Sequence, residues 1–309
     1  MSARFWARAP GKLNLCLFLG EARGDGRHEL VTLFQPVSLA DEVSLSVGGV
    51  RGDDVVVCPG VEGPNIVARA LAQLRARGWE APCVRVEVVK RIPVAAGMAG
   101  GSADAAATLR LAPAAYPLPR SSVADEVAAI LGADVPSQLS PGPALGTGAG
   151  EAVTPVPARG PLAFVILPSS ERLSTPAVYA EADRLGLARS GPELLERRHA
   201  LEAALRAGPG LPSELLVNDL EPAARSLCPS IGDGLELARS LGAETALVCG
   251  SGPTVAGLFW GADGGARAER AAAAAAERGV PAVAAEPVDA AFAAAHVSNV
   301  SPVRHNEGS

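Results

Sequence analysis

The amino-acid sequence predicts an α+β fold, in which strands and helices occur in mixed order and do not form a strict strand–helix–strand repeat. Segments where apolar and polar residues alternate indicate half-buried strands, and alanine-rich segments of about ten residues or more indicate helices. A chain of 309 residues can bury one large core or two medium ones. Glycines and prolines gather between residues 141 and 161, so we expect domains at 1–158 and 159–309.

In the first half, alternation of apolar and polar residues predicts three strands. These strands cover residues 13–19, 43–47 and 84–88. A helix is expected over 65–77, because Asn65 is a favourable N-cap and Gly78 a favourable stop. A further helix is expected from about 121 to 131, before Gly132.

The second half continues with both element types. Short apolar runs predict strands at 164–167, 245–249 and 255–260. Helical spacing predicts helices at 176–186, 192–207, 231–241 and 265–278. The last dozen residues, 298–309, are expected to form a frayed tail.

The composition excludes several classes of protein. The chain is 48% hydrophobic and 19% charged with a net charge of −6, which is typical of a soluble globular protein. No basic stripe with interleaved aromatics is present, so nucleic-acid binding is not expected. A signal peptide and a membrane-spanning apolar run are also missing, which favours the cytoplasm and no membrane partner. Five widely spaced cysteines indicate neither disulfides nor a zinc site, and Cys16 and Cys249 are expected to be buried.

The most informative segment covers residues 93–108, where an apolar strand ending in proline leads through a glycine-rich turn into an alanine-rich helix. Gly97, Gly100 and Gly101 suit a backbone that approaches a ligand closely or adopts positive φ. The start of the following helix, near Ser102, would offer unpaired N–H groups to a phosphate. An ordinary strand–turn–helix would have the same pattern, and the segment alone does not decide between them. It is neither a Walker A loop nor a dinucleotide fingerprint, because its spacing is G-x-x-G-G-S.

Three glycine-containing segments, at residues 9–15, 93–108 and 249–255, resemble in order and spacing the three motifs of the GHMP kinases, a family of small-molecule kinases. Further segments are similar to the 4-diphosphocytidyl-2-C-methyl-D-erythritol kinases within that family. They cover residues 25–30, 32–35, 131–136, 144–151 and 218–221. The resemblance extends from about residue 7 to 260, which is most of the chain.

The resemblance implies an N-terminal domain of the ribosomal-protein S5 type, a ferredoxin-like C-terminal domain, and an active site in the cleft between them. It implies phosphorylation by ATP and Mg²⁺ of the 2-hydroxyl of a CDP-linked sugar alcohol, in the methylerythritol phosphate route to isoprenoids. The Mg²⁺ ligands remain unknown, and the chain is expected to be a monomer or a homodimer.

The same resemblance assigns site residues. Asp134 would be the general base and Lys12, one of only two lysines, its partner. Taken singly, Asp134 also fits a turn residue and Lys12 a solvated charge. ATP would contact Pro93, Val94, Ala95, Ala96, Gly97, Met98, Ala99, Gly100, Gly101, Ser102 and Ala103. The substrate would contact Asn14, Arg27, His28, Gly250, Ser251 and Gly252.

Some of these assignments stay open. On a strand, Asn14 shares a face with Lys12, which suits two polar groups reaching into one cleft. Ser102 and Asp104 either contact the phosphates or Mg²⁺ or cap the helix. Thr175 and Tyr179 match a family segment whose role is less certain.

The chain departs from the family pattern at two positions where an aromatic residue is usual. Arg27 precedes the histidine, and Ser137 follows Asp-Val-Pro. A guanidinium plane can also stack on a base, which would preserve cytosine recognition. The alternatives are a GHMP kinase for another small alcohol, such as mevalonate, homoserine or a sugar, and a catalytically silent nucleotide-binding relative. Retention of both Lys12 and Asp134 argues against the silent relative.

Overall fold

The computed structural model describes residues 3–48 and 52–299, and within this part of the chain the strands form two sheets. The first sheet has seven strands, five of them in the order β11-β1-β2-β4-β3, with β5 added to β2 and β6 to β5. Their bounds are β1 Ala3–Ala22, β2 His28–Val47, β3 Val55–Val57, β4 Val84–Val89, β5 Ala144–Thr147, β6 Ala152–Pro155 and β11 His296–Asn299. Every pairing is antiparallel except that of β3 with β4.

Strands β1 and β2 form one long hairpin of 20 residues on each side, far longer than the strands predicted at 13–19 and 43–47. Pro10 and Gly11, residue types that weaken a strand interior, lie within β1. In the structure, the register between β1 and β2 shifts between Pro10 and Lys12, and such an irregularity lets the pairing continue past them.

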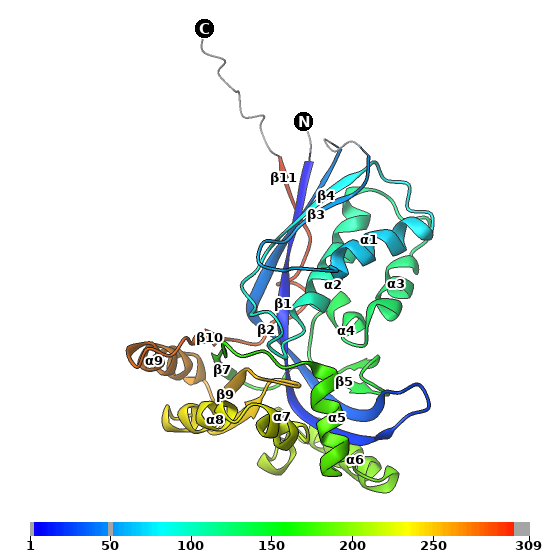
Figure 1. Cartoon of the computed structure of the whole chain (residues 1–309). Helices are drawn as coiled ribbons and strands as arrows, with labels where there is room; N and C mark the ends of the chain where they lie inside the picture. Colours follow the sequence, from blue (N-terminus) through cyan, green and yellow to red (C-terminus); the bar gives the residue numbers. More distant parts are fainter. Residues whose placement is uncertain (1–2, 49–51, 300–309) are drawn as a thin grey trace.

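Helices α1 to α4 cover one face of the first sheet (Figure 1). Their bounds are α1 Ile66–Ala76, α2 Gly100–Ala115, α3 Val123–Leu131 and α4 Val135–Leu139. As expected, Asn65 caps α1 by accepting the N–H of Val67 at 2.8 Å, and Gly78 follows with φ of +85°. Five alanines of α2 are fully buried, and their small side chains let this helix lie close against β1 and β2; they are Ala103, Ala105, Ala106, Ala107 and Ala112.

The second sheet has the order β10-β7-β9-β8 and is covered by helices from the second half of the chain. Its strands are β7 Leu162–Leu167, β8 Thr245–Val248, β9 Val255–Trp260 and β10 Val283–Ala285. The helices are α5 Thr175–Leu185, α6 Gly191–Ala207, α7 Glu221–Leu227, α8 Ser230–Ser240 and α9 Gly264–Glu277, with a short 3₁₀ turn at Ser213–Leu215. The predicted strands and helices of this half are confirmed, whereas α7 and β10 were not anticipated.

The hairpin of β1 and β2 connects the two parts of the molecule. Leu17 exchanges backbone hydrogen bonds with Val217 and Asp219, and Leu19 accepts one from Arg189. Apolar side chains of this hairpin, such as Phe18, share one core with residues of the second sheet. The site between the two parts is therefore built on a continuous piece of backbone.

The chain does not stay in the second part after residue 159, because β11 returns to pair with β1 in the first sheet. The division at 158/159 remains a prediction. The expected tail at 298–309 is wrong for residues 298 and 299, which belong to β11, and its remainder lies outside the described residues. Within the described ranges, no helix is long and apolar enough to cross a membrane.

Candidate active site

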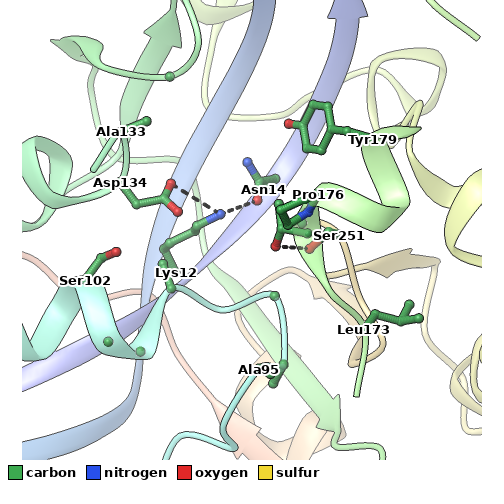
Figure 2. A pocket seen from close by; sticks show the side chains of 18 of the residues that line it. Lys12, Asn14, Ala95, Ser102, Ala133, Asp134, Leu173, Pro176, Tyr179 and Ser251 are labelled. Atoms are coloured by element: carbon green, nitrogen blue, oxygen red, sulfur yellow. Dashed lines mark hydrogen bonds and ion pairs between the residues drawn. The ribbon is translucent and has the colours of Figure 1, made fainter. Parts of the chain in front are cut away.

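A cavity of about 970 Å³ lies between the two parts of the molecule. Its wall combines β1, the segment 93–102, the start of α4, α5 and the turn after β8 (Figure 2).

Lys12 and Asn14 project into this cavity from the same face of β1, as their spacing on a strand predicts. Lys12 is 5% exposed, and its Nζ donates to Asn14 Oδ1 at 2.7 Å. Asn14 Nδ2 in turn donates to Thr32 Oγ1 at 2.7 Å, and that hydroxyl donates to the carbonyl of Cys16. This chain of hydrogen bonds fixes the ammonium group where it meets the cavity.

Asp134 faces Lys12 from the N-terminal end of α4, with 3.7 Å between its Oδ1 and Lys12 Nζ. The Asp134 side chain is 37% exposed, so it remains accessible to a bound molecule. Tyr179 lies on the same cavity wall, and burial together with the negative charge of Asp134 raises its pKa to about 12. The site therefore pairs a buried cation with an accessible carboxylate and a neutral phenol.

The segment before α2 has an irregular backbone, with positive φ at Ala95, Gly97 and Ala99. Gly97 is the position where only glycine fits, because a Cβ there would lie 1.8 Å from the carbonyl oxygen of Cys249. Gly100 and Gly101 do not have positive φ, because they lie in the first turn of α2. Since α2 starts at the cavity wall, the free N–H groups of its first turn open into the cavity.

Most of the predicted ATP-binding residues line the cavity. They are Pro93, Val94, Ala95, Ala96, Gly97, Ala99, Gly100, Gly101 and Ser102. Met98 and Ala103 do not line the cavity, because they are buried in the protein core. Met98 packs beneath Gly11, and its carbonyl accepts the backbone N–H of Lys12, so it ties this segment to β1.

A buried ion cluster lies at the base of α2. Lys90 Nζ contacts Asp104 Oδ2 at 2.7 Å and also Asp41 Oδ2, while Asp41 Oδ1 accepts the N–H groups of Arg91 and Ile92. Asp104 therefore does not cap the helix, since its carboxylate is engaged with Lys90. The rarity of lysine in the sequence marked Lys90 for attention, but its two partners could be found only in three dimensions.

Charge and burial act against each other in this cluster. Burial raises the pKa of Asp104 to about 7, although Lys90 opposes the shift. Burial also disfavours the charge on Lys90, but its two carboxylate neighbours outweigh this and raise the lysine's pKa.

The third glycine segment closes the cavity from the second part. Gly250 and Ser251 lie on the wall, and the hydroxyls of Ser251 and Thr175 are 2.9 Å apart. Asn218 Nδ2 holds the segment by donating to the carbonyls of Val248 and Gly250. Gly252 does not reach the cavity, because it packs behind the turn against Val248 and Ile231.

One end of the cavity is formed by His28, Arg27, Tyr179 and Asp183. His28 is 6% exposed, its Nε2 lies 2.7 Å from Asp183 Oδ1, and its ring centroid lies 5.3 Å from that of Tyr179. Arg27 is half exposed and its guanidinium pairs with Asp25 at 2.9 Å. Tyr179, placed by the sequence in a family segment of less certain role, thus supplies an aromatic ring at this end of the cavity.

Ser137, the second departure from the family pattern, points away from the cavity. Its hydroxyl donates to the backbone carbonyl of Asp134 at 2.9 Å, so it supports the turn that carries the carboxylate.

The opposite end of the cavity is more apolar and lies beside the segment before α2. It is lined by Cys58, Val61, Pro64, Asn65 and Ile66. Asn65 and Ile66 were predicted from the sequence to lie at the start of a helix, and Cys58 and Val61 were assigned no role in binding. Their contribution to a binding site follows from the packing of α1 beside α2.

Comparison with known proteins agrees with this architecture. The model "GHMP kinases N terminal domain" matches residues 65–142, and "GHMP kinases C terminal" matches residues 200–280. A 4-diphosphocytidyl-2-C-methyl-D-erythritol kinase of Thermobifida fusca is 45% identical over 272 residues, covering 83% of this chain and 87% of the relative. A kinase of the same name from Streptomyces avermitilis is 42% identical, covering 83% and 88%.

Solved structures show the same relationship. A crystal structure of 4-(cytidine 5'-diphospho)-2C-methyl-D-erythritol kinase matches with 34% identity and a TM-score of 0.70, covering 91% of this chain and 98% of that one. A homoserine kinase from Cytophaga hutchinsonii has a TM-score of 0.69 at 17% identity and shares the fold. The chain therefore belongs to the GHMP kinases, within the family of 4-diphosphocytidyl-2-C-methyl-D-erythritol kinases.

Proposed function

We propose that the protein transfers the γ-phosphoryl group of ATP to the 2-hydroxyl of 4-diphosphocytidyl-2-C-methyl-D-erythritol, a step in the synthesis of isoprenoid precursors. The observation that carries this proposal is the pair of Lys12 and Asp134, 3.7 Å apart on the cavity wall between the N-terminus of α2 and the end formed by His28. The names of the relatives supply the acceptor.

Phosphoryl transfer requires alignment, neutralisation of charge, and a group that takes the proton of the acceptor hydroxyl. Asp134 is the accessible carboxylate that accepts this proton. Lys12 is held by Asn14 and keeps its charge directed at the site, where it stabilises the ionised Asp134 and the transferring phosphoryl group.

The nucleotide fits the half of the cavity beside α2. Its phosphates would meet the N–H groups of the first turn of α2, and its base would enter the apolar end near Val61 and Ile66. No group of three or more His, Cys, Asp or Glu side chains within the described ranges forms a metal site. Mg²⁺ would be held with the nucleotide phosphates, with the Ser102 hydroxyl as an oxygen donor on the wall, and it would neutralise phosphate charge.

The CDP-linked substrate fits the other half. Its base would lie by Tyr179 and His28, with Arg27 at the cavity edge and the sugar alcohol beside Asn14 and Asp134. The dependence of this reaction on ATP suits the cytoplasm.

Purified protein should be assayed for ADP release with ATP, Mg²⁺ and each of three acceptors: the CDP-linked methylerythritol, mevalonate and homoserine. We expect turnover with the first substrate and little with the others. Asp134→Asn serves as the matched control, since it keeps the size of the side chain but removes its basicity. Faster turnover of mevalonate or homoserine would refute the assignment within the family.

A further inference from the structure

We propose that Asp183 is a positioning residue that fixes the tautomer of His28 and thereby makes the site select cytosine over uracil. The inference rests on the proposed function, because it concerns the base of the CDP-linked substrate.

The bond between these two residues joins the two parts of the molecule. His28 begins β2 in the first part, and Asp183 lies on α5 in the second, 155 residues further along the chain. His28 Nε2 and Asp183 Oδ1 are 2.7 Å apart, a short distance for a hydrogen bond that involves a charged group. The His28 ring is buried, whereas the Asp183 side chain is 54% exposed.

This contact determines where the histidine carries its proton. A carboxylate has only acceptor oxygens, so in the contact with the carboxylate of Asp183 it is Nε2 of His28 that donates. In the neutral imidazole the other nitrogen, Nδ1, then has a lone pair and acts as an acceptor. Without Asp183, either nitrogen would be free to hold the proton.

Helix α5 presents both an aromatic ring and this carboxylate to the histidine. Tyr179 and Asp183 are separated by four residues and therefore lie on the same face of α5, and both line the cavity end that contains His28. The Tyr179 ring is tilted by 41° relative to the His28 ring, with 5.3 Å between centroids. A pyrimidine held against Tyr179 would have its polar edge near His28.

The two pyrimidines differ at that edge. Cytosine carries an amino group at position 4, which is a donor, whereas uracil carries a carbonyl there, which is an acceptor. An acceptor nitrogen on His28 pairs with the amino group and repels the carbonyl. One such contact corresponds to a discrimination of roughly tenfold to a hundredfold.

The test compares the CDP-linked methylerythritol with its UDP-linked analogue in the wild type, Asp183→Ala and Asp183→Asn. In Asp183→Ala, the ratio of kcat/KM for the CDP-linked substrate to kcat/KM for the UDP-linked analogue should fall at least tenfold, because KM for the CDP-linked substrate rises. The kcat of this variant and its KM for ATP should stay within about twofold of the wild type. The ratio for Asp183→Asn should lie between those of the wild type and Asp183→Ala, because the amide oxygen of asparagine can still accept a hydrogen bond from Nε2. Asp233→Ala, which removes an exposed carboxylate on α8, is the control and should leave kcat/KM unchanged for both substrates.

A second readout does not depend on turnover. ¹⁵N spectra of histidine-labelled protein, with His28 assigned by the His28→Gln variant, should show the Nε2–H tautomer in the wild type and its loss in Asp183→Ala. An Nδ1–H tautomer in the wild type, or unchanged discrimination in Asp183→Ala, would overturn the proposal. If the wild type turns over neither substrate, the proposed function fails, and the spectra still decide whether Asp183 sets the tautomer.

Discussion

Replacement of Gly97 by alanine tests how the segment before α2 is held against the second part of the molecule. Gly97 has φ of +76°, and a Cβ built on it lies 1.8 Å from the carbonyl oxygen of Cys249 and 3.0 Å from the backbone nitrogen of Gly252. Both atoms that the new Cβ would meet belong to the backbone, so no flexible side chain can move aside to make room.

Two costs combine in Gly97→Ala. A non-glycine residue in the left-handed region costs about 1–2 kcal/mol, and forcing extra volume into packed structure costs about 1–3 kcal/mol. We therefore expect a loss of about 2–5 kcal/mol, a large part of the roughly 5–15 kcal/mol that stabilises a typical domain. ATP affinity should fall as well, because the turns at 97 and 249–252 would have to separate.

Gly101→Ala is the matched control. Gly101 lies in the first turn of α2 with helical φ, and the nearest atom to its added Cβ is Ile66 Cγ2 at 3.5 Å, an ordinary contact. Alanine is favoured over glycine in a helix by up to about 1 kcal/mol, so this variant should be at least as stable as the wild type. Urea unfolding followed by circular dichroism compares the midpoints. Equal midpoints for the two variants would refute the packing argument at Gly97.

Three further predictions concern charges in the cavity. Lys12→Met and Asp134→Asn should each lower kcat by about two to four orders of magnitude, and the double variant should be little worse, because the pair acts as a unit; additive losses would contradict this. The free energy of unfolding should fall as pH rises from about 4 to 7. The reason is that the raised pKa of about 7 keeps Asp104 protonated in the folded protein over this range, whereas the unfolded chain releases this proton at lower pH. Asp104→Asn should lack this decline, as urea titrations across that pH range would measure. Arg27→Ala should raise KM for the CDP-linked substrate about fivefold or more, whereas Arg27→Tyr should preserve it; initial rates with unchanged KM in both would exclude a role in base binding.

Local patterns in the sequence predicted many of the helices and strands of this protein. The alternation around Leu13–Leu19, the cap at Asn65 and the alanine-rich run after Gly101 each depend on neighbours a few residues away, so the elements they predict are present in the structure. The placement of Lys12 and Asn14 on one face of a strand was also local, since it follows from a period of two. The ordered glycine segments then identified the family, which in turn supplied the fold and the expected roles.

The tertiary structure decided which side chains meet. Within the segment 93–103, it turned Met98 and Ala103 into the core and left their neighbours on the cavity wall, a division that depends on what packs against each residue. The contact between His28 and Asp183 was not visible in the sequence, because it requires α5 to fold back against the β1–β2 hairpin. Short-range periodicity follows from backbone geometry, whereas contacts across the chain follow from the burial of whole faces. For this reason the sequence predicted most of the elements and the glycine-rich turn before α2, and only the folded chain brought His28 to Asp183 and Lys90 to Asp104.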